Sequence, residues 1–175
     1  MSDSTDSDAV AQLKSDLLDS ARLLHDSGTP TEILAHFVGA QRRWGIRLAP
    51  VLRPVTRVWR LGVLLIDVDG NLYSTGQLIR AAPVGRPQNL SLSAEERRAY
   101  RAAAERGRIQ PGETVNFNAR FVTVTVSGLK NEDETLFVRD GKTWVRWSSR
   151  SLEPREARKY ITERVAFLLS PPEGS

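Results

Sequence analysis

The strongest constraint on the fold is the pair Asp69-Gly70, which lies between two stretches of strand-type residues within residues 58–80. Asp-Gly is among the preferred pairs for a two-residue type I′ loop, since both loop residues then take a positive φ. The upstream stretch is apolar on both sides, so we expect helices or a partner subunit to cover both of its faces. The loop predicts one long hairpin with the pairs Asp67–Leu72, Leu65–Ser74, Val63–Gly76, Leu61–Leu78 and Trp59–Arg80.

A second Asp-Gly pair, Asp140-Gly141, predicts a second hairpin. A two-residue turn there places five aromatic and basic residues on one face, and these are the candidate ligand-binding residues Phe137, Arg139, Lys142, Trp144 and Arg146. The other face, with Leu136, Val138, Val145 and Trp147, is expected to be buried. Aromatic rings that stack on bases, beside cations that bind phosphates, are typical of single-stranded nucleic-acid binding. The alternative is cation–π packing at a sheet edge or beneath the last helix, with Glu153 or Glu156 neutralising the charge.

Helical spacing of apolar residues begins at Asp8 and predicts a first helix that Gly28 ends. The segment Thr29-Pro30-Thr31-Glu32 has the form of a capping box and predicts a second helix, ending at Gly45. A further capping box at residues 93–96 predicts a middle helix that Gly107 ends, and a last helix is expected over 154–169.

These elements predict an α+β fold, with an antiparallel sheet built from hairpins, an N-terminal helix pair, one middle helix and one C-terminal helix. We expect a disordered lead over residues 1–7, a single domain over 8–170 and a tail over 171–175.

Composition limits the function classes. The chain has no cysteine, which excludes disulfides, thiolate metal sites and a cysteine nucleophile. The opening residues are acidic and polar, unlike a signal peptide, and no stretch is apolar for the roughly 18 to 20 residues that a membrane span needs. We therefore expect cytoplasmic residence and no membrane partner. The formal charge of +4 comes from 25 basic and 21 acidic residues without a tract of five basic residues, so it indicates nucleic acid only weakly.

Residues 64–72, which end in Asp67-Val68-Asp69-Gly70-Asn71-Leu72, resemble the first motif of the haloacid dehalogenase superfamily. The resemblance implies a magnesium-dependent phosphatase in which Asp67 attacks phosphorus and Asp69 acts as acid and base. In that family, however, a loop and a helix follow the motif, whereas here Leu72 to Ile79 continues as a strand. We therefore interpret the segment as a hairpin, because short motifs depend on their structural context.

The stretches at residues 59–65, 72–76 and 112–118 resemble short proteins of high-GC actinobacteria, a similarity that implies a lineage and no activity. We expect no catalytic residues, metal or cofactor, and interpret the chain as a non-enzymatic protein-interaction domain that forms a homodimer. The doubly apolar strand or the N-terminal helices are expected to provide the contact. The alternatives are a single-stranded nucleic-acid-binding module that uses the Asp140-Gly141 hairpin, and the phosphatase.

Overall fold

The computed structural model describes residues 2–83, 92–148 and 153–171. These residues form two compact units, each with its own hydrophobic core. Unit 1 comprises residues 1–31, 58–74 and 120–175, and unit 2 comprises residues 32–57 and 75–119. The chain passes between the units four times, so neither unit is one continuous stretch. The single domain expected over residues 8–170 stays a prediction.

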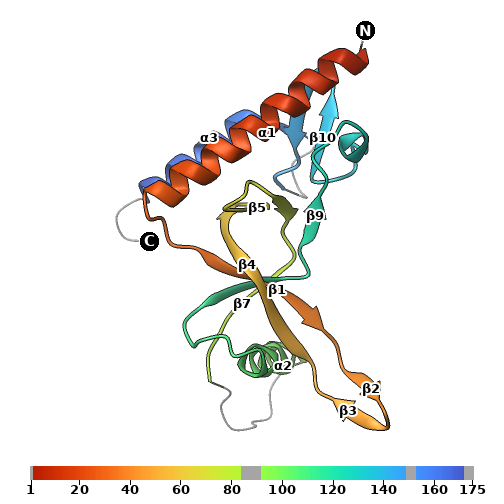
Figure 1. Ribbon diagram of the computed structural model, residues 1–175, viewed down its shortest axis with the longest axis vertical. Coiled ribbons are helices and arrows are strands. Elements are labelled where there is room, and N and C mark those ends of the chain that lie inside the picture. The colour runs from red at the N-terminus through yellow and green to blue at the C-terminus, as the bar shows by residue number, and fades with distance from the viewer. Residues whose placement is uncertain (1, 84–91, 149–152, 172–175) are drawn as a thin grey trace. The chain divides into compact units, whose positions relative to one another are not determined.

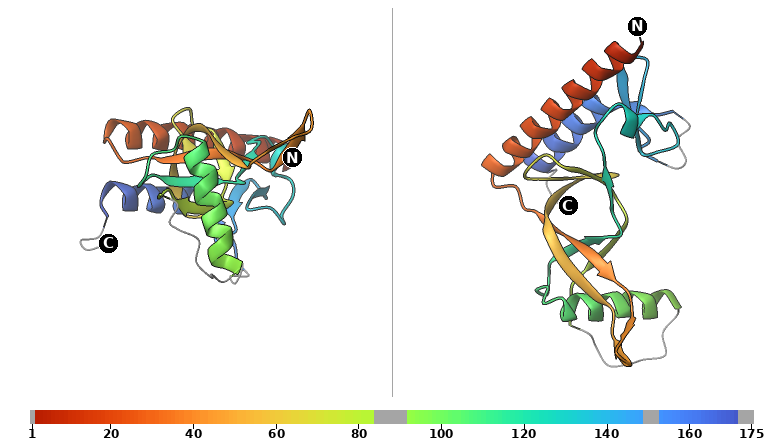
Figure 2. Two further views of the ribbon diagram at one scale, coloured as in Figure 1. Left: turned by 90° about the horizontal axis from the view of Figure 1, so that it is seen from below. Right: turned by 45° about the vertical axis from the view of Figure 1, so that its right-hand side comes forward.

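Unit 1 combines helices with short antiparallel strands (Figures 1 and 2). Its elements are α1 (Ser2–Asp26), the end of β4 (Val51–Leu61), β5 (Leu64–Asp67), β6 (Leu72–Ser74), β9 (Arg120–Val122), the 3-10 helix η1 (Ser127–Leu129), β10 (Leu136–Arg139), β11 (Lys142–Val145), β12 (Arg155–Glu156) and α3 (Ala157–Leu169).

Helices α1 and α3 run side by side in unit 1 (Figure 2). The predicted apolar stripe of α1 is buried against α3 and the strands, from Val10 through Leu17 to Leu24. From α3, Tyr160 and Ile161 enter the same core. The helix begins at Ser2 and not at Asp8, so residues 2–7, which were expected to form a disordered lead, belong to α1.

The strands β4, β5, β6 and β9 follow one another in the sheet of unit 1. This order corrects the expected long hairpin, because the chain already turns at Gly62-Val63, where β4 ends and β5 begins. Gly62 has a φ of +69°, which suits such a turn. The predicted reversal at Asp69-Gly70 is confirmed, but the observed pairs are Leu64–Ser74, Leu65–Tyr73 and Ile66–Leu72, one residue out of the expected register.

Unit 2 contains β1 (Glu32–Val38), β2 (Gln41–Arg43), β3 (Ile46–Leu48), residues 51–57 of β4, β7 (Gln77–Arg80), α2 (Leu92–Arg106) and β8 (Thr114–Phe117). Within this unit the strand order is β7-β8-β1-β4. Strand β7, which was expected to pair with residues 59–61, instead pairs antiparallel with β8. Strand β1 pairs parallel with β8, so the sheet is mixed and not purely antiparallel.

Of the two N-terminal helices that were expected, the first is confirmed as α1 and the second is wrong. Residues 32–38 form β1, and the stretch that follows forms the β2–β3 hairpin. Ile33 and Ala35 lie in the core of unit 2 with Val115 and Phe117 of β8. The predicted middle and C-terminal helices are confirmed as α2 and α3. Across residues 2–83, 92–148 and 153–171, every helix is too short or too polar to cross a membrane.

Candidate functional site

The first candidate site is the turn between β5 and β6, where the phosphatase resemblance places Asp67 as the nucleophile. The Asp67 side chain is buried, and its carboxylate accepts four hydrogen bonds. The backbone amides of Asp69 and Asn71 donate to Oδ1 at 3.0 and 2.9 Å. Asn71 Nδ2 and the Tyr73 hydroxyl donate to Oδ2 at 3.0 and 3.3 Å. These bonds occupy both carboxylate oxygens, so Asp67 holds the turn together.

Contacts in the same turn explain why the register of β5 and β6 differs by one residue from the expected one. Asp67 N also donates to the Asn71 carbonyl, and Gly70 N donates to the Asp67 carbonyl, which closes a three-residue loop over residues 68–70. Gly70 takes the left-handed position with a φ of +78°. Burial raises the pKa of the Tyr73 hydroxyl above its usual value, and the nearby Asp67 carboxylate raises this pKa further. The Tyr73 hydroxyl therefore stays protonated and remains a donor to Asp67.

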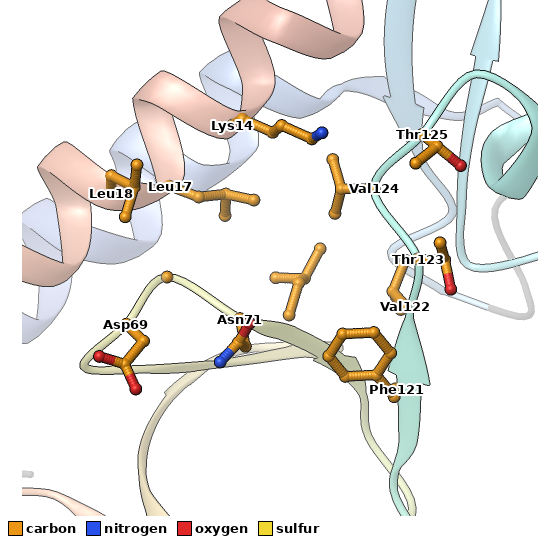
Figure 3. Close-up of a pocket in the computed structure, with 12 residues that line it drawn as sticks. Lys14, Leu17, Leu18, Asp69, Asn71, Phe121, Val122, Thr123, Val124 and Thr125 are labelled. Carbon is orange, nitrogen blue, oxygen red and sulfur yellow. The ribbon is translucent and has the colours of Figure 1, made fainter.

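Asp69, the expected acid and base, lies at a hollow of about 330 Å³ in unit 1 (Figure 3). Leu17, Leu18 and Lys14 of α1 line one side, and Phe121 with the residues after it lines the other. Asp67 is not among the residues that line it. Among the described residues, no group of three histidine, aspartate or glutamate side chains is placed to hold a metal ion. Within the described part of the chain, Asp69 therefore lines the hollow without Asp67 and without a third acidic side chain placed beside them to hold a metal.

The second candidate site is the Asp140-Gly141 hairpin, whose predicted register is confirmed. Phe137 pairs with Trp144 and Arg139 with Lys142. Asp140 and Gly141 have φ values of +53° and +69°, as a type I′ turn requires. Leu136, Val138 and Val145 are buried as expected, whereas Trp147, which was expected on the buried face, is 39% exposed.

The aromatic and basic face of this hairpin is packed only around Phe137, and Arg139 and Lys142 are exposed. Phe137 is fully buried, with the guanidinium groups of Arg139 and Arg146 5.7 and 5.3 Å from its ring centre. Glu132 binds both cations: its carboxylate pairs with Arg139 at 3.0 Å, and its carbonyl accepts from Arg146 at 2.7 Å. Trp144 is only half-buried and pairs across the strand with Glu156, while Lys142 is exposed. This arrangement matches the expected alternative of cation–π packing at an edge, with Glu132 in the neutralising role.

A third candidate, which the sequence interpretation missed, is the hairpin of β2 and β3, hereafter the arm (residues 41–48). It lies between β1 and β4 in the chain (Figure 1), and every residue from 39 to 49 is exposed. Trp44 and Gly45 form its turn, with φ values of +54° and +78°. Trp44 is 91% exposed, and Ile46 is 65% exposed. Leu48 of the arm is exposed as well, and it is exposed apolar residues grouped into a patch, not single ones, that mark a contact surface.

The arm is also basic. Arg42 lies directly opposite Arg47, and Arg43 lies opposite Ile46. Within the described residues, no hydrogen bond or ion pair engages the side chains of these three arginines. Two cations directly across a ladder repel each other unless an anion lies between them. No acidic side chain among the residues that the structure describes neutralises the Arg42–Arg47 pair.

Charge is divided unevenly between the two units. Unit 2 contains twelve arginines and five acidic residues, a formal charge of +7, whereas unit 1 contains thirteen basic and sixteen acidic residues, a formal charge of −3. The modest net charge of +4 hides this division. A strong asymmetry of this kind favours a polyanionic partner for the basic unit.

Comparison with known proteins adds no relative: no family model, no curated protein and no solved structure matches this chain.

Proposed function

We propose that this chain is a non-enzymatic interaction domain and that the arm is its contact element. The observation that carries the proposal is the unbroken exposure of residues 39–49 around Trp44. A two-stranded hairpin on its own is only marginally stable in water. Because Trp44 and Ile46 are exposed, they do little to stabilise the arm itself. Tryptophan and arginine are the side chains most enriched at binding hot spots, and the arm contains both.

The contact surfaces expected from the sequence do not support the proposal in its original form. Strand β5 is buried on both faces within the chain, and the apolar stripe of α1 is buried in the core of unit 1. The arm is the alternative contact surface. We also propose that the protein resides in the cytoplasm.

Photo-cross-linking tests the arm as a contact element. A photoreactive phenylalanine analogue replaces Trp44 in the full chain, and a matched control replaces Leu23, a half-exposed apolar residue of α1. Irradiation in living cells is expected to give a discrete adduct of lower mobility from position 44 and none from position 23. If position 44 gives no more adduct than position 23, the arm is not a contact element.

Self-association is tested separately by sedimentation velocity. A homodimer held by the arm predicts a wild-type sedimentation coefficient that rises with concentration and a Trp44→Ala variant that stays monomeric. A dimer that Trp44→Ala leaves intact places the contact elsewhere.

A further inference from the structure

We propose that the arm binds double-stranded DNA by entering the major groove, an inference that rests on the arm being the contact element. The partner is a duplex with two phosphate backbones and a groove that admits a two-stranded β-ribbon. The major groove of B-form DNA, about 12 Å wide, has this property.

The first support is the distribution of cations over the ribbon. Facing residues of a hairpin share a face, so Arg42 and Arg47 lie on one face and Arg43 lies on the other. An element in the major groove has a phosphate backbone on each side of it, and cations on both faces suit this arrangement. A single strand bound along one face would leave the cation on the other face without a phosphate.

The second support is a hollow of about 510 Å³ at the base of the arm. Arg42 and Arg47 line it together with Ala40, Gln41, Leu48 and Ala49. A phosphate between the two guanidinium groups relieves their mutual repulsion and accepts charge-assisted hydrogen bonds from both. The hollow and the cross-strand pairing therefore place the same two arginines, Arg42 and Arg47, around one position for a phosphate.

The third support is the tip of the arm. Trp44 is the most exposed of the large apolar residues, and it lies where a ribbon in a groove meets the floor of base edges. An apolar side chain there contacts base edges, such as the thymine methyl group, and contributes no charge. The tip and the arginines therefore make separable contributions, apolar contact from Trp44 and phosphate binding from the arginines.

The charge of +7 on unit 2 provides the long-range attraction that nonspecific DNA binding requires. Double-stranded RNA does not fit the proposal, since its major groove is too deep and narrow for side chains to read. Anionic lipid would also attract these arginines, but it offers no groove and no requirement for base pairing.

Fluorescence anisotropy with the full chain and a labelled 20-base-pair duplex tests the proposal. Three arm arginines on phosphates predict a slope of log affinity against log salt of about −2.7, or a loss of about 40-fold between 50 and 200 mM salt. In Arg42→Gln/Arg47→Gln the slope is expected to weaken by about 1.8, because two phosphate contacts are lost. Trp44→Ala is expected to lower affinity at every salt concentration and to leave the slope unchanged.

The control is Arg22→Gln/Arg158→Gln, which removes the same charge from two exposed positions of unit 1. It is expected to bind like the wild type. All variants alter exposed side chains, and unchanged thermal unfolding verifies their folds. The proposal is overturned if the arm variant and the control bind the duplex equally, or if the wild type binds no duplex. Preference for single-stranded DNA, equal affinity for duplex RNA, or binding to phosphatidylglycerol vesicles alone also overturns it.

The cross-link at position 44 separates failure of this inference from failure of the proposed function. An adduct that DNase shortens supports DNA as the partner. If the adduct resists DNase and is digested by protease, the DNA inference is wrong while the arm remains a contact element. If no adduct forms, both proposals fail.

Discussion

Replacing Asp67 by alanine is expected to destabilise the protein strongly. The buried carboxylate accepts from two backbone amides, one side-chain amide and one hydroxyl. Leaving a buried donor unpaired costs about 1–3 kcal/mol, so the two turn amides and the lost side-chain bonds together predict about 3–5 kcal/mol. For a chain of this length each kcal/mol lowers the melting temperature by about 2–4 °C, which predicts a fall of about 6–20 °C. Thermal unfolding followed by circular dichroism measures it.

Two further variants sharpen this test. Asp67→Asn keeps an oxygen acceptor for the turn amides but sets an amide against the Asn71 and Tyr73 donors, so we expect a smaller loss, about 1–2 kcal/mol. Asp69→Ala changes an exposed side chain in the same turn and is expected to stay within about 0.5 kcal/mol of the wild type. A nucleophile can usually be removed without loss of stability. If Asp67→Ala unfolds like the wild type, or abolishes a phosphatase activity, the structural role assigned to Asp67 is refuted.

Two other predictions concern single contacts. Glu113→Gln is expected to lower stability at pH 7 by about 0.5 kcal/mol, because Arg57 donates to the Glu113 carboxylate at 2.8 and 3.1 Å on a partly exposed surface. The hydrogen bond from Arg57 holds the pKa of Glu113 below its ordinary 4.5, so this contribution is full above pH 4.5 and is lost as pH falls through the lowered pKa. Urea unfolding at pH 7 and pH 3 measures the difference between wild type and variant, and a difference that does not shrink from pH 7 to pH 3 contradicts the assignment. Tyr160→Phe is expected to cost about 1 kcal/mol in the same assay, because Val63 N donates to the buried Tyr160 hydroxyl at 3.1 Å, and an unchanged midpoint contradicts this role.

Local turn and helix-end chemistry predicted part of the fold correctly. Asp140 and Gly141 both accept a positive φ, so the two-residue turn and the pairs beside it follow from the sequence. Gly107 placed the end of α2 correctly, since helix ends depend on nearby residues, but the helix begins at Leu92, so Ser93 lies inside it and not at the N-cap that the capping box predicted.

The β5–β6 turn shows where local reasoning failed. Asp69-Gly70 has the same turn chemistry as Asp140-Gly141, yet it forms a three-residue loop. The difference lies in Asp67, whose carboxylate binds the amides of Asp69 and Asn71 and stabilises the longer loop. Gly62 also breaks the upstream strand, which the apolar pattern alone did not indicate.

The error at residues 32–38 has a longer-range cause. Ile33, Leu34, Phe37 and Val38 fit helical spacing, and they equally fit a buried strand, which short apolar runs do not distinguish. The choice is made by parallel pairing with β8, more than 80 residues further along the chain. This pairing leaves no trace in local spacing. The same error hid the arm, because a helix over residues 30–44 would have placed Trp44 on a packed face.

The candidate site was predictable in its residue types but not in its accessibility. The five residues expected at the Asp140-Gly141 hairpin lie in the expected register, but Phe137 is buried beneath Arg139 and Arg146, while Arg139 and Lys142 stay exposed. The register of a strand pair does not show which loop folds over it. The charge of unit 2 was likewise hidden, because its residues come from two separate stretches of the chain.

Chemical-shift mapping of the full chain, titrated with the 20-base-pair duplex, tests the central claim most directly. The amide signals of Gln41 to Leu48 are predicted to shift together, with the indole signal of Trp44 among the largest changes. Shifts that centre on residues 137–146, or a spectrum that the duplex leaves unchanged, would contradict the assignment of the arm as the DNA-binding element.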